Sequence, residues 1–395
     1  MKPLEIKNGI YSVGVVDWNL RDFHGYSTEK GTSFNAFLVK GEKTVLFDTV
    51  KADFAGQLIK NIKEIIDPIN IDYIVVNHAE MDHSGALPVV IELIKPKKLI
   101  CTKACKDALM AHFHRDDWPF EIIKEGDILD IGGKTIQFFG SAMIHWPEST
   151  VSYLREDKIL ISNDIFGQHW ATSERFDDEV EPGELYYQAT KYYANIFMPT
   201  SPAVRKFLDK LSKLNLQFDI LAPDHGLIWR KNPSEIWKKY GSWAEGETKP
   251  KAVIIYDTMW GSTAKMAASV ARGLSGGVVI KLCDLKNTHR SNVITEVLDA
   301  KAVILGSSLM NGGLLPRMAD MLCYMKGLRP SHKIGAAFGS YGWSNTVVKL
   351  LNEAMEEMKF QIIGEGVSTQ YVPDEGTLNQ CLQLGEQVRE SILNV

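Results

Sequence analysis

Four potential metal ligands lie within six consecutive residues of this sequence, and this cluster constrains the fold more than any other feature. The segment His78-Ala79-Glu80-Met81-Asp82-His83 directly follows an apolar run, residues 73–77, which is typical of a buried strand. A single histidine after a strand usually makes an ordinary hydrogen bond in a loop. Four ligand-type side chains in six residues have little structural reason, so the cluster predicts a metal site.

Three further apolar runs end in residues of the same kind. They are residues 136–144 before His145, residues 159–163 before Asp164, and residues 218–223 before Asp224 and His225. Because α/β folds place their ligands where strands end at one edge of a sheet, we expect these side chains to join the first cluster.

The number and chemistry of the candidate ligands indicate two metal ions. Seven side chains exceed the four ligands of a closed zinc site but suit two metals bridged by one carboxylate, and Asp164, which stands alone in the sequence, is the natural bridge. Imidazoles combined with carboxylate oxygens and open positions suit redox-active iron. The predicted ligands are His78, Glu80, Asp82, His83, His145, Asp164 and His225.

The chain divides into two predicted domains, residues 1–248 and 249–395. The stretch at residues 246–251 is polar and contains a proline, and a new apolar strand begins directly after it. In the first domain we expect mixed sheets with outer helices. The expected strands are residues 9–16, 33–39 paired with 44–48, and 128–130 paired with 135–139, and the expected helices are residues 54–65 and 86–94.

The second domain alternates strands with helices, as a doubly wound parallel sheet does. The expected strands are residues 252–256, 277–283, 302–305 and 333–338, and the expected helices are residues 264–274, 292–300, 316–326 and 346–358.

The loop after the first strand of this domain predicts a phosphate site. It reads Asp257-Thr258-Met259-Trp260-Gly261-Ser262-Thr263 and opens a helix, whose free amides and dipole favour an anion. It has no lysine, so it is not a Walker A loop, and it lacks the Gly-x-Gly-x-x-Gly pattern of dinucleotide sites. A single terminal monophosphate therefore fits best.

Two more glycine-containing loops, residues 307–313 and 339–344, follow strands of the same domain. Their free backbone groups and their aromatic side chains suit a flat polar ring, although one such loop alone would also fit a flavodoxin-like domain that binds nothing. Three loops at one edge favour FMN. The predicted FMN-binding residues are Thr258, Met259, Trp260, Gly261, Ser262, Thr263, Ser307, Leu309, Met310, Asn311, Gly312, Gly339, Ser340, Tyr341, Gly342 and Trp343.

Charge and cysteine usage exclude some classes of protein. A net charge of -5 argues against a nucleic-acid binder, which needs a basic surface. No window approaches 18 consecutive apolar residues and the N-terminus has no signal-like apolar region, so we expect no membrane partner. Five scattered cysteines fit reduced thiols and a cytoplasmic location.

The two sets of motifs together resemble the flavodiiron proteins, also called A-type flavoproteins. The zinc hydrolases of the metallo-β-lactamase fold carry His-x-His-x-Asp-His, whereas Glu80 here replaces the middle histidine. The phosphate loop is similar to the flavodoxin pattern Thr-x-Thr-Gly-x-Thr, with Trp260 in place of the middle threonine. The resemblance implies an α/β and α+β two-domain fold, a metallo-β-lactamase-like αββα sandwich followed by a flavodoxin-like doubly wound parallel sheet.

The resemblance also implies a ligand set for each iron. One iron is expected on His78, Glu80 and His145, the second on Asp82, His83 and His225, with Asp164 as the bridge. The engagement of His83 varies within the family, so its ligation stays open. His24 and one of Tyr192 or Tyr193 are expected beside the site, although packing explains the tyrosines equally well. His112, His114, His169, His289 and His332 are interpreted as structural.

The activity implied is reduction of dioxygen to water or of nitric oxide to nitrous oxide. A reduced flavin and a reduced iron pair together hold four electrons, as many as dioxygen needs to become two waters. The sequence has no rubredoxin module of its own, so we expect electrons from rubredoxin or another low-potential donor, or from a reduced deazaflavin. Because the linker at residues 246–251 is short, and because family members pair head to tail, we expect such a homodimer, and the resemblance also allows a tetramer.

Two other functions fit parts of the sequence. A zinc hydrolase with an attached flavodoxin domain fits the fold, but Glu80 argues against it, and metal analysis distinguishes the two. A non-enzymatic electron carrier needs only the flavin and leaves the ligand cluster unexplained.

Overall fold

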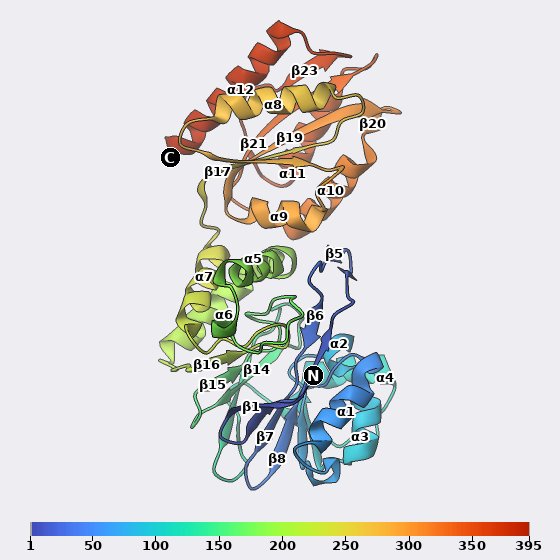
Figure 1. Cartoon of the computed structure of the whole chain (residues 1–395), viewed down its shortest axis with the longest axis vertical. Helices are drawn as coiled ribbons and strands as arrows, with labels where there is room; N and C mark the ends of the chain where they lie inside the picture. The colour runs from blue at the N-terminus through green and yellow to red at the C-terminus, as the bar shows by residue number, and fades with distance from the viewer. Residues whose placement is uncertain (1, 395) are drawn as a thin grey trace. The chain divides into compact units, whose positions relative to one another are not determined.

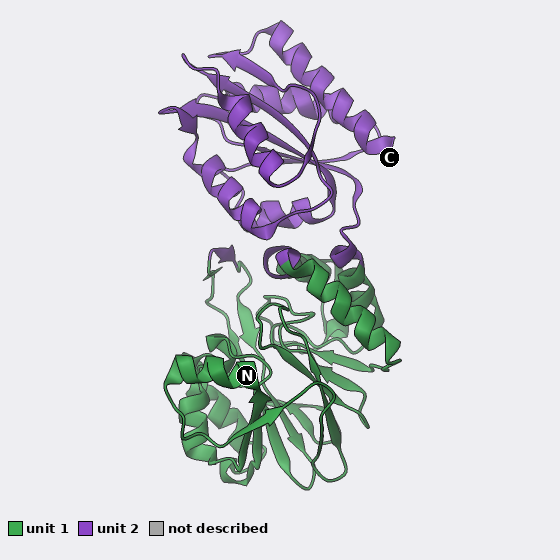
Figure 2. Cartoon of the chain, turned by 180° about the vertical axis from the view of Figure 1, so that it is seen from behind, with its two compact units in different colours: residues 1–24, 28–193, 200–241 green, residues 25–27, 194–199, 242–395 purple. Residues whose placement is uncertain are grey.

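The computed structural model describes residues 2–394 and divides the chain into two compact units. Unit 1 comprises residues 1–24, 28–193 and 200–241, and unit 2 comprises residues 25–27, 194–199 and 242–395 (Figure 2). No helix within residues 2–394 combines the length and the apolar character that crossing a membrane requires.

Unit 1 contains two facing sheets (Figure 1). The first has the order β1 (Leu4–Lys7), β2 (Ile10–Ser12), β7 (Phe37–Lys40), β8 (Thr44–Phe47), β9 (Tyr73–Val75), β10 (Lys98–Thr102) and β11 (Phe120–Ile123). The second has the order β12 (Ile128–Asp130), β13 (Thr135–Gly140), β14 (Thr150–Leu154), β15 (Ile159–Ile161) and β16 (Ile220–Ala222).

The central strands of the first sheet are buried on both faces, because their side chains alternate between two apolar cores. Phe37 and Val39 of β7 point into the core shared with the second sheet, which also contains Ile136 and Ile161. Leu38, between them in sequence, points into the core under the outer helices. Those helices are α1 (Ala55–Lys63), α3 (Leu87–Ile94) and α4 (Lys103–Phe113). Helices α5 (Pro182–Tyr192) and α6 (Ser201–Lys213) follow β15, and α7 (Pro233–Glu245) follows β16.

Both predicted hairpins of the first domain form, as the antiparallel pairs β7–β8 and β12–β13. The strand expected over residues 33–39 is divided, however, into β6 (Thr32–Phe34) and β7. The strand expected over residues 9–16 is broken into β2 and β3 (Val15–Asp17). Gly14 lies between them, and a Cβ atom there would meet the carbonyl oxygen of Phe34 at 2.3 Å. The side-chain amide of Asn61 donates to the carbonyls of Val13 and Gly14, so these two backbone acceptors at the break have hydrogen-bond partners.

Unit 2 is the doubly wound parallel sheet that the sequence predicts. Its strands have the order β18 (Val279–Asp284), β17 (Lys249–Tyr256), β19 (Ala300–Met310), β21 (Ile334–Tyr341) and β22 (Gln361–Ile362), with β23 (Val367–Gln370) also parallel to β21 and β20 (Gly313–Leu314) antiparallel to β19. Helices α8 (Ser262–Leu274) and α12 (Glu375–Leu393) share one core on one face of this sheet, and α9 (Arg290–Leu298), α10 (Pro316–Leu328) and α11 (Val347–Glu357) lie on the other (Figure 1).

Candidate metal centre and flavin pocket

All seven predicted metal ligands lie together in unit 1, in two groups. The candidate ligand atoms within each group are all within 4.8 Å of one another. One group consists of His78, Glu80, His145 and Asp164, and the other of Asp82, His83 and His225.

Asp164 connects the two groups, because its two carboxyl oxygens face different ones. Oδ2 lies 2.9 Å from Nε2 of His145 and 3.4 Å from Nε2 of His78. Oδ1 lies 3.1 Å from Nε2 of His83 and 3.3 Å from Nε2 of His225. This is the position that a bridging carboxylate needs.

The ligands come from both sheets of the sandwich, which corrects the expectation of one sheet edge. β9 of the first sheet leads to His78, whereas β15 and β16 of the second sheet lead to Asp164 and His225. The strand expected through residue 144 ends at Gly140, and His145 lies in a loop that the Ser141 N–H closes by donating to the carbonyl of Ser149. The site therefore lies where two facing sheets end together.

A short helix places the middle of the cluster. Glu80 occupies the N-cap of α2 (Met81–Ser84), and Asp82 and His83 lie on that helix. The Ser84 hydroxyl donates to the Ala79 carbonyl at 2.7 Å, and the Thr49 hydroxyl donates to the His83 carbonyl at 2.7 Å. These bonds hold the backbone of α2, so that Glu80 points toward one group of ligands and Asp82 and His83 toward the other.

Several buried polar atoms of the cluster form no well-aligned hydrogen bond within residues 2–394, although Nε2 of His83 and Oδ1 of Asp164 lie 3.1 Å apart. They are both carboxyl oxygens of Asp82, both ring nitrogens of His83 and Oδ1 of Asp164. A buried polar group without a partner is costly, so these atoms fit metal ligands better than they fit a packed core. Three carboxylates and four imidazoles also form the mixed donor set that suits iron.

The carboxylates of the cluster favour positive charge on the groups between them. Burial opposes the charged imidazoles, but hydrogen bonds to Glu148 and Glu80 raise the pKa of His78 to about 10, and Asp164 and Glu80 raise that of His145 to about 9. Burial also opposes the charge on Asp164, but His83 and His145 hold its pKa well below the usual range. The carboxylates thus attract either protons on the imidazoles or metal cations.

Two of the histidines are oriented by an acceptor behind the ring. Nδ1 of His78 donates to Oε1 of Glu148 at 2.8 Å, and Nδ1 of His225 donates to the carbonyl of Ser33 at 2.8 Å. Such bonds fix the tautomer that turns Nε2 toward a metal. The sequence assigns no role to Glu148, although its position three residues after His145 is a signal.

The three residues predicted beside the metals lie at different distances from the candidate ligands. Nε2 of His24 is 3.9 Å from Oε1 of Glu80, and the His24 side chain is 77% exposed. The ring centroid of Tyr192 is 5.8 Å from that of His225. Tyr193 points elsewhere, since its hydroxyl bonds with Ser201 and its ring packs on Tyr240. Of the two tyrosines, the structure therefore brings only Tyr192 to the cluster.

His169 lies in the site, although the sequence suggests a structural residue. Its ring centroid is 4.8 Å from His225 and 4.9 Å from Tyr192, and its Nδ1 is 2.8 Å from the Thr32 hydroxyl. Burial and the neighbouring His225 hold its pKa well below the usual value, so the ring is neutral. A position five residues after Asp164 was the available signal.

The other four histidines that we interpret as structural lie in different surroundings. His112 stacks on Trp146, which in turn contacts His78. His114 is the C-cap of α4, His289 is the N-cap of α9, and His332 lies beside Gly246.

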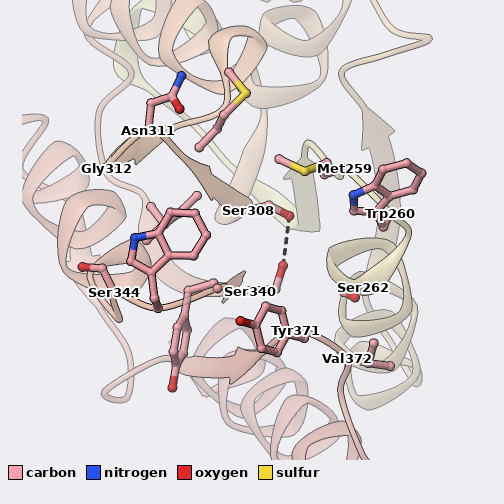
Figure 3. Close-up of a pocket in the computed structure, with 15 residues that line it drawn as sticks. Met259, Trp260, Ser262, Ser308, Asn311, Gly312, Ser340, Ser344, Tyr371 and Val372 are labelled. Atoms are coloured by element: carbon pink, nitrogen blue, oxygen red, sulfur yellow. Dashed lines mark hydrogen bonds between the residues drawn. The ribbon is translucent and has the colours of Figure 1, made fainter.

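Unit 2 contains a cavity of about 470 Å³ at the ends of β17, β19 and β21 (Figure 3). The N-terminus of α8 opens at Ser262 in its wall, and Gly261 before it adopts a φ of +89°. The hydroxyls of Ser308 and Ser340 bond with each other at 2.9 Å beneath the cavity, where the Thr263 hydroxyl also bonds with Ser308. Hydroxyls, a helix N-terminus and apolar walls suit a flat ring that carries a phosphate.

Eleven of the sixteen predicted flavin residues line this cavity. They are Met259, Trp260, Ser262, Leu309, Met310, Asn311, Gly312, Ser340, Tyr341, Gly342 and Trp343. The other five are not among the residues that line it: Thr258, Gly261, Thr263, Ser307 and Gly339. Ser308 and Ser344 also line it; they lie in the two predicted loops but are absent from the predicted set. Tyr371 and Val372 line it as well, and they follow β23, a strand that the sequence does not predict.

Comparisons with known proteins cover the whole chain. Two family models match, the ODP family beta lactamase over residues 32–226 and the flavodoxin family over residues 254–385. The nitric oxide reductase of Moorella thermoacetica is 45% identical over 395 residues, which cover 99% of each chain. The solved structure of rubredoxin oxygen:oxidoreductase from Desulfovibrio gigas is 42% identical with a TM-score of 0.98, and covers 100% of this chain and 99% of that one. The flavodiiron protein of Giardia intestinalis is 31% identical with a TM-score of 0.97, over 100% of this chain and 97% of that one.

Proposed function

The chain belongs to the flavodiiron proteins, and we propose that it reduces dioxygen to water or nitric oxide to nitrous oxide at a di-iron centre fed by FMN. The position of Asp164 between two groups of ligands carries this conclusion, because a bridging carboxylate implies two metals that act on one small molecule. Relatives that align along the full chain bear oxidoreductase names, which supports this function over a zinc hydrolase or an electron carrier.

We assign the ligands as two sets. His78, Glu80 and His145 would hold one iron, Asp82, His83 and His225 the second, with Asp164 between them. When bound, the irons supply electrons and open positions for the oxidant, and FMN supplies electrons that arrive from the donor.

The residues around the ligands exclude bulk water and hold protons. Phe23 packs against His169 and His24, with ring centroids 5.2 Å and 4.5 Å away, and so covers this side of the cluster with an apolar ring. Burial and the nearby Asp164 raise the pKa of Tyr192 well above its usual value, so its phenol keeps its proton as a donor. The exposed imidazole of His24 lies beside Glu80, with Nε2 3.9 Å from Oε1.

The predicted loops of unit 2 would hold the FMN. The free amides at the N-terminus of α8 face the cavity and would bind the phosphate, while Tyr341 and Trp343 offer rings for the flavin. We propose the functional boundary at residues 248 and 249, which lies between the two matched family regions.

The donor and the location follow as further proposals. The name of the Desulfovibrio gigas relative supports rubredoxin as donor, and a reduced deazaflavin is the alternative. All five cysteines are free thiols, four of them buried, which supports a reducing compartment such as the cytoplasm.

Turnover with each oxidant tests this function. Rubredoxin would be reduced beforehand without leftover reductant and mixed, in large excess, with iron- and FMN-loaded protein. The reaction would be run under dioxygen and separately under nitric oxide, with the zinc-loaded protein as control. We expect catalytic oxidation of rubredoxin by at least one oxidant. Equal rates for the iron and zinc forms would refute the proposal.

We further propose a head-to-tail homodimer in which the flavin of one chain serves the irons of its partner. Large apolar side chains are exposed at both sites, which supports a covering partner. Trp260 and Trp343 at the flavin cavity are 90% and 89% exposed, and Met81 and Met143 beside the metal ligands are 42% and 50% exposed. A two-fold arrangement would cover both sites in both chains with one kind of interface.

Complementation between two inactive variants is the expected result of this arrangement. Gly261→Asp removes the flavin and Asp164→Ala removes the iron pair, so a mixed dimer keeps one intact flavin opposite one intact iron centre. We expect such mixtures to recover up to about a quarter of wild-type activity, since half of the dimers are mixed and each has one working pair. Mass spectrometry would establish subunit exchange. Proven exchange without recovered activity would contradict the proposed electron path.

A further inference from the structure

Asp224 is a buried acid that the proposed ligand sets leave without a role. It is 0% exposed, and neither carboxyl oxygen accepts a hydrogen bond from any residue in the described range 2–394. Its backbone is held on both sides, because its N–H donates to the Asn163 carbonyl and its own carbonyl accepts from the Asn35 N–H, both at 2.7 Å. The backbone thus fixes the direction of a side chain whose own oxygens are unsatisfied.

The group that faces Asp224 is the imidazole of His83. Oδ2 of Asp224 lies 3.8 Å from Nδ1 of His83, and that nitrogen also has no hydrogen bond to a described residue. The nearby carboxyl of Asp48 is already engaged, since it accepts from the backbone N–H of Asn77 at 2.7 Å and from its side-chain amide at 2.8 Å. An unsatisfied donor and an unsatisfied acceptor therefore face each other in a buried place.

The other ring nitrogens of the site show what is missing at His83. His78 and His225 each have an acceptor at Nδ1, the carboxylate of Glu148 and the carbonyl of Ser33. Asp224 stands in the same relation to His83, but about 1 Å too far for a hydrogen bond of ordinary length. A carboxyl group accepts through an oxygen whether it is charged or protonated, so this role does not depend on the ionisation of Asp224.

We propose that Asp224 is the positioning residue of His83: it accepts a hydrogen bond from Nδ1–H and so commits Nε2 of His83 to the second metal. This inference rests on the proposed di-iron function and deepens it, because it assigns His83 as a ligand in this chain. Nε2 of His83 already lies 3.4 Å from Asp82 and 3.1 Å from Asp164, on the side where that metal would bind. Fixing a ligand's tautomer through such an acceptor typically changes metal affinity by about 10- to 100-fold.

The test measures iron(II) binding by the full chain against a competing chelator, without turnover. We expect Asp224→Ala to weaken one of the two irons by about 10- to 100-fold and to leave the other unchanged. Asp224→Asn keeps an acceptor oxygen of the same size and should retain most of the affinity. Glu148→Ala is the matched control, because it removes the acceptor of His78 and should loosen the other iron instead.

A double variant shows whether Asp224 acts through His83. In a His83→Ala background, adding Asp224→Ala should change the affinity of the weaker iron by less than about threefold, because the group that it positions is gone. A general loss of structure would instead weaken both irons and release the FMN. If wild-type protein binds two irons and Asp224→Ala binds both as tightly, the role of Asp224 is refuted and the proposed di-iron function stands. If wild-type protein does not bind two irons, the proposed function fails with it.

Discussion

Asp164→Ala is expected to abolish reduction of both oxidants and to leave the chain with at most one iron, while one FMN stays bound. Asp164 offers one oxygen to each group of ligands, so its loss would remove the proposed bridge and the one carboxylate among residues 2–394 that faces both groups. It also leaves four histidines with less negative charge to attract cations. We expect the rate to fall at least about 1,000-fold, the scale on which removal of an essential catalytic group acts.

Asp157→Ala is the matched control for this variant. Asp157 is another buried carboxylate of unit 1, paired with Lys134 and outside the ligand cluster. Its loss should lower stability but leave two irons and normal turnover per folded chain. Colorimetric iron analysis, flavin absorbance and oxidant consumption would be measured on both variants. Asp164→Ala protein that turned over normally with two irons would contradict the bridging role.

Gly261→Asp is expected to abolish FMN binding and thereby donor-dependent turnover, while the irons stay bound. Gly261 precedes α8 with a φ of +89°, a conformation that glycine adopts without strain. An aspartate there would place a negative charge beside the phosphate. Two like charges about 4 Å apart near a protein surface repel by several kcal/mol, so we expect FMN affinity to fall at least about 100-fold.

Gly276→Asp separates the charge from the backbone strain. Gly276 also has a positive φ, +102°, and like Gly261 it has no atom of residues 2–394 within 4 Å of a built Cβ. It follows the C-terminal end of α8, however, whereas Gly261 precedes the N-terminal end that would bind the phosphate. The affinity of each apoprotein for FMN follows from quenching of flavin fluorescence. If both variants lost FMN equally, strain would explain the loss and the phosphate site would be misplaced.

The sequence predicts which side chains gather at the candidate metal site, because residues of ligand type are recognisable in the sequence and most of them stand directly after apolar runs. The location of the site in the fold does not follow from the residue types alone. The strand before His145 ends at Gly140 and the approach continues as a loop, and hydrophobicity alone does not separate such a loop from a strand. Which sheet each strand joins depends on pairing between residues far apart in the sequence. The sequence alone therefore does not predict that the site lies where two sheets meet.

Residues that act through other residues are harder to find. Glu148, His169 and Asp224 each gain their role from a contact across the fold, to His78, His225 and His83 respectively. Each lies within five residues of a predicted ligand, but this spacing does not reveal which residue it contacts across the fold. Similarly, Tyr371 reaches the flavin cavity only because β23 pairs with β21, and β23 is a short strand whose sequence, Val-Ser-Thr-Gln, is mostly polar.

Anomalous X-ray scattering from crystals of protein made in iron-replete cells tests the di-iron centre most directly. Data recorded on both sides of the iron edge and of the zinc edge identify each metal and place it. We predict two iron peaks, one among His78, Glu80 and His145 and one among Asp82, His83 and His225, with Asp164 between them. Zinc at these positions, or a single metal that leaves one group of ligands empty, would contradict the account.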